Sequence, residues 1–152
     1  MRGRVVIRCA EAGDIDRILE LSSRLYSEDG EVPFARARAS TALGALVGNE
    51  RLGVVLVADE DGEVVGFLAL VWGFSLESGG RDAFVDELYV ASDWRGRGIG
   101  TALMESAEAA CATGGAGALH LVVERSNPGA ERLYRRLGFD GREVSLLTKR
   151  LS

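Results

Sequence analysis

The sequence predicts a domain of the α/β or α+β class. Stretches of strand character alternate with stretches of helix character, and no repeat, low-complexity tract or linker rich in proline and serine interrupts them. The 152 residues are the length of one ordinary domain, enough to bury a hydrophobic core without disulfides. We therefore expect residues 1–152 to form a single domain.

The N-terminal part is expected to hold one strand and two helices. Residues 4–9 form a short apolar run that is typical of a strand. Apolar residues then recur at helical spacing over 14–25, behind a possible N-cap at Asp14. The segment SEDGEVP at 27–33 is expected to end this helix, and the alanine-rich residues 34–47 predict a second helix.

A β-hairpin is predicted around the dipeptide Asp61-Gly62. The apolar runs on its two sides, at 53–60 and 63–74, have strand character, and Asp-Gly is a strong signal for a two-residue turn. The two strands should pair antiparallel. A further strand is predicted over 82–90.

The C-terminal part is expected to alternate helices and strands. A helix over 99–113 precedes a strand over 118–123. Pro128 near the first turn and Gly138 at the end delimit another helix, and residues 144–149 predict a last strand.

Composition and charge exclude several classes of function. No stretch approaches the roughly 18 apolar residues of a membrane span, and the N-terminus does not resemble a signal peptide, so we expect a cytoplasmic protein. Cys9 and Cys111 lie far apart and His120 is the only histidine, so neither a disulfide framework nor a metal site is expected. The formal charge of −5 argues against nucleic-acid binding and fits a cationic small molecule better.

Residues 94–101 read WRGRGIGT, directly after a predicted strand and before a predicted helix. A P-loop would need a lysine after its second glycine, but Thr101 follows Gly100; a dinucleotide-binding GxGxxG would need a third glycine where Thr101 stands. Neither motif fits, but the feature that they share still predicts an anion-binding site. Glycines let several backbone N–H groups converge, and the N-terminus of the next helix adds positive charge. A phosphate or pyrophosphate is the expected ligand, with Arg95 and Arg97 at its rim.

Two segments resemble the signatures of the GNAT superfamily of N-acetyltransferases. VDELYVASDWRGRGIGTAL at 85–103 is similar to the central acetyl-CoA motif, in which Arg95, Gly98 and Gly100 match the defining positions. SNPGAERLYRRLGF at 126–139 resembles the second signature, in the family's order and spacing. The resemblance implies a three-layer α+β fold with about four helices and a mixed, mostly antiparallel sheet of six or seven strands, splayed between the fourth and fifth.

The resemblance also implies where acetyl-CoA, the co-substrate, would bind, and it implies no metal. In this family the backbone of the strand before the glycines contacts the pantetheine arm, and amides at the start of the next helix hold the pyrophosphate. Asn127 matches a position that contacts the cofactor, although an N-cap ahead of Pro128 explains it as well. The matching positions are Leu88, Tyr89, Val90, Arg95, Gly96, Arg97, Gly98, Ile99, Gly100, Thr101 and Asn127.

Acetyl transfer to an amine requires a base, because a free alkyl ammonium is protonated at neutral pH. Asp86 and Glu87 are the candidates. Since they are consecutive on a predicted strand, their side chains should point to opposite faces, so that at most one reaches the acceptor cavity. The resemblance, strongest here to the spermidine/spermine type, places an acid at Asp86 in this role, often through water. The two residues rank nearly equally, and both can also be ordinary solvated or salt-bridged acids.

The departing thiolate requires a proton, and Tyr134 matches the family's catalytic tyrosine. A phenol can supply the proton only where it is held within reach of the sulfur. Tyr134 also belongs to an apolar helical stripe with Ala130, Leu133 and Leu137, so a core position is the alternative. The oxyanion is expected to be held by a backbone N–H at Leu88 or a neighbour.

The resulting prediction is a transferase that moves acetyl from acetyl-CoA to a primary amine by direct attack in a ternary complex. A small cationic amine is the expected acceptor. Glu28, Asp29 and Glu31 fall in the segment that, by resemblance, walls the acceptor site, where they would attract a polycation; an ordinary acidic loop explains them equally well. His120 is interpreted as a partly exposed structural residue.

Two alternatives remain open at this point. One is a protein acceptor, either a lysine or an N-terminal amine, although Val122 stands where protein-alanine acetyltransferases often carry an acid. The other is a non-catalytic module that senses acyl-CoA. A dimer is common in the resembled family, and the sequence leaves the oligomeric state open.

Overall fold

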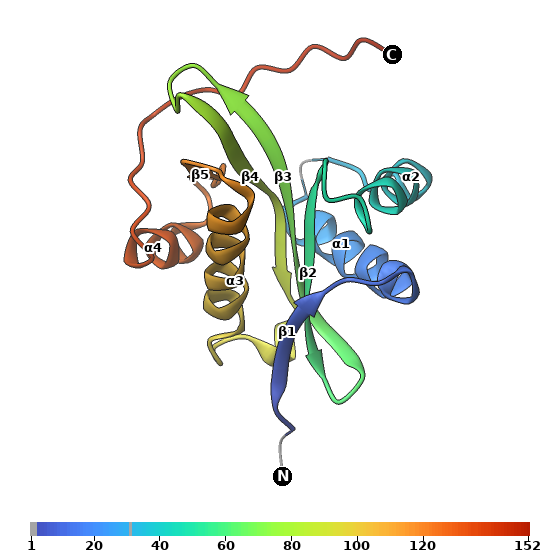
Figure 1. Cartoon of the computed structure of the whole chain (residues 1–152). Helices are drawn as coiled ribbons and strands as arrows, with labels where there is room; N and C mark the ends of the chain where they lie inside the picture. The colour runs from blue at the N-terminus through green and yellow to red at the C-terminus, as the bar shows by residue number, and fades with distance from the viewer. Residues whose placement is uncertain (1–2, 31) are drawn as a thin grey trace. The chain divides into compact units, whose positions relative to one another are not determined.

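The structure is a computed structural model that describes residues 3–30 and 32–152. Five strands and four helices follow one another along the described chain (Figure 1). In order, they are β1 (Val5–Cys9), α1 (Ile15–Asp29), α2 (Arg36–Leu46), β2 (Gly53–Glu60), β3 (Glu63–Ser75), β4 (Gly80–Val90), α3 (Ile99–Gly114), β5 (Leu119–His120) and α4 (Pro128–Arg136).

Residue contacts divide the chain into two compact units, Met1–Val122 and Val123–Ser152. The first unit contains the whole sheet with α1, α2 and α3, and the second contains α4 and the C-terminal segment. The expectation of a single domain over 1–152 stays a prediction.

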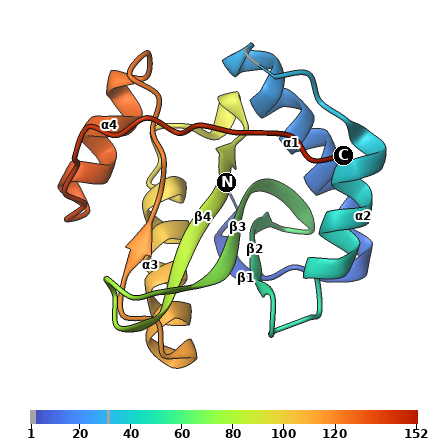
Figure 2. The ribbon, with the colours of Figure 1, turned by 90° about the horizontal axis from the view of Figure 1, so that it is seen from above.

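The sheet of the first unit has the strand order β1-β2-β3-β4-β5. Neighbouring strands from β1 to β4 pair antiparallel, whereas β5 runs parallel to β4. Helices α1 and α2 cover one face and α3 covers the other, which gives three layers (Figures 1 and 2). The mixed, mostly antiparallel sheet and the three-layer arrangement were both expected from the resemblance.

The β2–β3 hairpin confirms the turn predicted at Asp61-Gly62. Glu60 pairs with Glu63 across a two-residue loop. Asp61 has a φ of 49° and Gly62 a φ of 92°. Positive φ at both central residues is what this kind of turn requires, and Asp and Gly tolerate it better than most residues.

The expectation of six or seven strands is wrong for the described residues, which contain five. Residues 144–149, predicted as a strand, belong to no strand, and β5 is shorter than the predicted 118–123. An alternating pattern becomes a strand only where a neighbouring strand supplies ladder hydrogen bonds. Without such a partner, the apolar side chains of the segment are exposed: Val144, Leu146 and Leu147.

Helix α1 is longer than the predicted 14–25 and ends at Asp29. Gly30 follows in the left-handed conformation with a φ of 70°, and its N–H bonds the carbonyl of Tyr26. The helix therefore ends inside the segment SEDGEVP, as expected, and the glycine of that segment is the stop signal. Glu28 and Asp29, expected in a loop, lie in the last turn of α1, while Glu31 lies outside the described residues.

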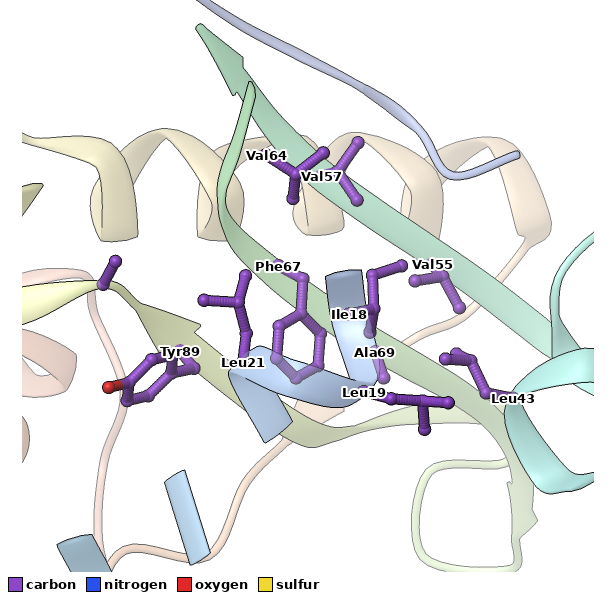
Figure 3. Packing of buried hydrophobic residues seen from close by; sticks show 11 residues of the cluster. Ile18, Leu19, Leu21, Leu43, Val55, Val57, Val64, Phe67, Ala69 and Tyr89 are labelled. Carbon is purple, nitrogen blue, oxygen red and sulfur yellow. The ribbon is translucent and has the colours of Figure 1, made fainter. Parts of the chain in front are cut away.

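The main core lies between the α1–α2 layer and the sheet (Figure 3). Leu21 is fully buried in α1 and Phe67 is 2% exposed in β3. The other face of the sheet is covered by buried side chains of α3, namely Ile99, Leu103, Met104, Ala107 and Cys111. β3 thus contributes buried side chains to both faces, and its neighbour β4 carries the candidate catalytic residues.

Candidate functional site

The glycine-rich turn connects the end of β4 to the start of α3. Gly96 and Gly98 have φ values of 75° and 78°, and open space surrounds the place of a side chain at each. Gly98 is the N-cap of α3, no side chain caps that end, and the first turn contains no acid. The first amides of α3 therefore keep the hydrogen-bonding capacity and the positive dipole end that an anion requires.

A cavity of about 340 Å³ lies beside this turn. Trp94, Arg97 and Gly98 line it together with residues of β1, including Val5 and Ile7. Neither of the candidate acids on β4 is among its lining residues. The cavity is thus distinct from the place where the carboxylates lie.

The two arginines of the turn are engaged with the protein. Arg95 donates from Nη2 to both carboxylate oxygens of Glu28, at 3.0 and 2.9 Å, and from Nε to the carbonyl of Val90 at 2.9 Å. Its guanidinium also lies 5.2 Å from the ring centroid of Tyr89. Arg97 donates to the carbonyl of Asp93 at 3.0 Å and lies over the Trp94 ring.

The opened edge of β4 begins just after its short ladder with β5. Only Ala83 and Phe84 pair with β5, so from Val85 onward this edge has no strand partner among the described residues. The predicted cofactor positions 88–90 pair with β3 on the opposite edge. The carbonyl of Val90 is occupied by Arg95, which leaves fewer free backbone groups here than the sequence suggested.

A β-bulge places Asp86 outside the β3–β4 register. Glu87 pairs with Ala69 and Val85 pairs with Leu70, so Asp86 is the extra residue of β4. A bulge breaks the strict alternation of side chains. Val85 and Glu87 pair with consecutive residues of β3 and so lie on opposite faces, and Asp86, which follows Val85, shares the face of Glu87. The expectation that Asp86 and Glu87 point to opposite faces is therefore wrong.

Glu87 is held in place by helix α1. Ser22 donates to its Oε1 at 2.5 Å, and the Tyr26 hydroxyl donates to its Oε2 at 3.2 Å. Burial raises the pKa of Glu87, and the two hydrogen bonds oppose that rise. Burial and the nearby Glu87 carboxylate also raise the pKa of Tyr26 to about 12, so this phenol stays protonated and remains a donor.

Asp86 differs from Glu87 in its surroundings. Its side chain is accessible and makes no hydrogen bond to any residue within the described ranges. Removal of part of its hydration by the surrounding protein nevertheless raises the pKa of its carboxyl. Asp86 is thus the carboxylate of the pair that has no hydrogen-bond partner among the described residues.

Ser22 and Tyr26 are site residues that the sequence interpretation missed. Ser22 is 5% exposed and lies on the buried stripe of α1 with Ile18 and Leu19. A serine within an apolar helical stripe is a usable signal, because a buried hydroxyl requires a partner. Nothing in the sequence identified Glu87 as that partner.

The second unit contains the other two predicted site residues. Asn127 caps α4, and its Oδ1 accepts a hydrogen bond from the N–H of Ala130 at 3.1 Å, which confirms the N-cap reading. The ring of Tyr134 meets that of Phe139 edge to face, with 6.0 Å between centroids. Burial raises the pKa of the Tyr134 phenol.

Over residues 3–30 and 32–152, no three His, Cys, Asp or Glu side chains group in a way that could hold a metal ion. Within the same ranges, no helix has the length and apolar character needed to cross a membrane.

Comparison with known proteins places these features in a family. The model of the acetyltransferase (GNAT) family matches residues 15–139. An uncharacterized N-acetyltransferase of Methanocaldococcus jannaschii is 33% identical over 91% of this chain and 62% of its own length. An N-alpha-acetyltransferase of Sulfurisphaera tokodaii is 32% identical over 93% of this chain and 82% of its own. The chain thus spans about three fifths of the length of the first relative.

Solved structures of other proteins share the fold of this chain. An integron cassette protein from the mobile metagenome of Cole Harbour Salt Marsh superimposes with a TM-score of 0.82 at 32% identity, covering 96% of this chain and 90% of that one. An aminoglycoside N-acetyltransferase in complex with CoA has a TM-score of 0.85 at 15% identity, covering 100% and 98%, which shows a shared fold. With the family match over most of its length and relatives above 30% identity, the chain belongs to the acetyltransferase (GNAT) family.

Proposed function

We propose that the protein transfers the acetyl group of acetyl-CoA to a primary amine, by direct attack in a ternary complex. The observation that carries this proposal is the pair Asp86 and Glu87 at a bulge of β4, on the strand that leads into an uncapped helix N-terminus. The bulge supplies an acid that can take a proton, and the helix end supplies amides for a diphosphate.

The chain's own residues fit acetyl-CoA as substrate. Gly96 and Gly98 leave room at the turn, and no acid in the first turn of α3 would repel a diphosphate. Arg95 and Arg97 add positive charge close by, although their described contacts are with protein groups. The thioester provides an activated acyl carbon, so the protein's task is to orient it and to move protons.

Asp86 is the base in this proposal, and Glu87 is a positioning residue. Asp86 has an accessible carboxylate with a raised pKa, and both features favour acceptance of a proton from an ammonium. Glu87 has both oxygens occupied by α1 donors and so fixes the bulge against that helix. Asp86 takes one proton from the ammonium, the neutral nitrogen attacks the carbonyl carbon, and the C–S bond breaks. The second proton that the nitrogen loses balances the one that the departing thiolate takes up.

Tyr134 is proposed as the acid that protonates the departing thiolate. This role rests on the resemblance of residues 126–139, which contain Tyr134, to the second signature of the family. The phenol carries a proton at neutral pH, as this role requires, and the raised pKa keeps it protonated. A bulge frees one residue of β4 from the ladder, and a backbone N–H in this region is proposed to stabilise the oxyanion.

A small cationic amine is the proposed acceptor. Asp86 and Glu87 lie together on one face, and the chain carries a formal charge of −5, which both favour a cation. An N-terminal amine of a protein is the second candidate, favoured by the name of the Sulfurisphaera tokodaii relative.

A thiol-release assay with acetyl-CoA tests the proposal. The panel should hold a monoamine, diamines, spermidine, an aminoglycoside, amino acids, a lysine peptide and peptides with free N-termini. Turnover with amines but not peptides supports the small-amine acceptor, and turnover with peptides alone supports the second candidate. Tight acetyl-CoA binding without turnover on any of them would favour an acyl-CoA sensor.

A further inference from the structure

A buried aspartate and the chain's only histidine meet where β4 and β5 pair. Asp82 is 5% exposed, and its Oδ2 lies 3.1 Å from Nε2 of His120 on the neighbouring strand. The His120 ring lies on the Phe84 ring with 5.0 Å between centroids, while its side chain remains 41% exposed. The pair therefore has a buried end at Asp82 and an accessible end at His120.

The hydrogen bond to Asp82 determines which nitrogen of His120 carries the proton. An ionised carboxylate can only accept, so Nε2 must donate its N–H to Asp82. In the neutral imidazole this leaves a lone pair on Nδ1, which can accept a hydrogen bond. No described residue hydrogen-bonds Nδ1, so it can accept a bond from a bound molecule.

His120 lies on the same face of the sheet as the carboxylates of Asp86 and Glu87. Phe84 lies opposite Val71 and Glu87 lies opposite Ala69, and Val71 and Ala69 are two residues apart on β3. Side chains two residues apart on a strand share a face, and so do directly paired residues. His120 pairs with Phe84 and therefore lies on this face as well.

The spacing along β4 suits one extended small molecule. Phe84 and Asp86 are two residues apart, which corresponds to about 7 Å along a strand. His120 lies one strand further, at about 5 Å in the hydrogen-bonding direction. A molecule with its reacting nitrogen at Asp86 can therefore place a second hydrogen-bond donor at Nδ1.

We propose that His120, oriented by Asp82, binds a second donor group of the acceptor, so that the protein prefers diamines to monoamines. This inference rests on the proposed function and names the acceptor class within it. In the bound state, one amino group lies at Asp86 and the other donates to Nδ1 of His120. Phe84 supplies an apolar surface beside the carbon chain that joins them.

Nuclear magnetic resonance of the unmodified protein tests the binding step, because a single histidine gives unambiguous imidazole signals. With CoA present at mildly alkaline pH, we expect ¹⁵N shifts of an imidazole protonated at Nε2 only. Addition of 1,4-diaminobutane should shift the Nδ1 and ring C–H signals saturably, and butylamine should not. A proton on Nδ1, or no shift at high 1,4-diaminobutane concentration, would overturn the inference.

The variant His120→Gln tests the same contact in turnover. Glutamine can still donate to Asp82, which keeps the buried carboxylate paired, but it has no acceptor at the place of Nδ1. We expect the KM for 1,4-diaminobutane to rise about tenfold, the effect of losing one charged hydrogen bond, with kcat and the butylamine KM unchanged. An equal rise for both amines, or no rise for the diamine, contradicts the inference; a melting temperature close to that of the wild type confirms that the variant is folded.

The two experiments separate this inference from the proposed function. Saturable His120 shifts without any thiol release would leave the diamine site standing and refute the transferase activity. If 1,4-diaminobutane supports thiol release from acetyl-CoA but does not shift the His120 signals, the transferase activity stands and the diamine site is refuted.

Discussion

The Ser22 hydroxyl donates a 2.5 Å hydrogen bond to Oε1 of Glu87, and so ties helix α1 to the bulged segment of β4. Ser22 is 5% exposed, so no bulk water replaces this bond if the hydroxyl is removed. Glu87 is the sequence neighbour of Asp86, so we expect this contact to hold the proposed base in position. The first prediction concerns its removal.

Ser22→Ala should destabilise the protein by about 1–2 kcal/mol, because the Glu87 carboxylate loses a donor in a buried place. It should also lower kcat severalfold while leaving the KM for acetyl-CoA unchanged. Thermal unfolding and steady-state kinetics measure the two effects. Ser27→Ala, at an exposed position of the same helix, is the matched control and should change neither. A fall in kcat equal for both variants would refute the positioning role of Ser22.

Gly98→Ala should damage the glycine-rich turn. Its φ of 78° is strained for alanine, at a cost of about 1–2 kcal/mol, and the added methyl lies next to the amides proposed to bind the diphosphate. Calorimetry should show acetyl-CoA binding at least tenfold weaker. Gly44→Ala, in the interior of α2 with open space around it, should instead stabilise the fold by up to about 1 kcal/mol. Unchanged acetyl-CoA affinity in Gly98→Ala would show that the turn is not the diphosphate site.

Asp86→Asn should raise the melting temperature at neutral pH. The folded protein raises the pKa of Asp86 above its ordinary value of 3.8, so ionisation of this group costs stability. The protonated group contributes fully below the ordinary pKa, and that contribution is lost as the pH rises through the higher folded-state pKa. The gain from Asp86→Asn should therefore be absent below pH 3.8 and appear as the pH increases toward 7. A gain that is largest in acid would show that the folded state lowers this pKa.

Glu28 and Arg95 connect the end of α1 to the glycine-rich turn. Their side chains are 45% and 48% exposed, so water and salt weaken the ion pair. A double-mutant cycle with Glu28→Ala and Arg95→Ala should give a coupling free energy of at most about 1 kcal/mol, decreasing at high salt. Denaturant unfolding at two salt concentrations measures it. A coupling free energy well above 1 kcal/mol, or one that does not decrease with salt, would contradict this account of a solvent-screened pair.

Most of the fold of the first unit could be predicted, because its signals are local. The Asp61-Gly62 turn has both required backbone angles, and the apolar spacing of α1 is confirmed by the buried Ile18 and Leu19. The last strand could not be predicted correctly, since an alternating pattern at 144–149 does not reveal whether a partner strand exists. Local pattern is a poor guide to long-range pairing.

The candidate site could be predicted by residue but not by geometry. Asp86, Glu87 and the glycine-rich turn were identified from the sequence, and the structure places all of them on or directly after β4. The bulge at Asp86 inverts the expected direction of one side chain, and no sequence signal marks it. The partners of Glu87 and Arg95 are 61 to 67 residues away along the chain, beyond the reach of any local pattern.

Asp86→Asn tested side by side for binding and for turnover addresses the central claim most directly. If Asp86 takes the proton of the amine, isothermal calorimetry should give an acetyl-CoA Kd within about twofold of the wild type, while thiol release with the best amine falls about 100-fold or more, the usual contribution of a general base. Thiol release at the wild-type rate, with acetyl-CoA bound normally, would contradict the account.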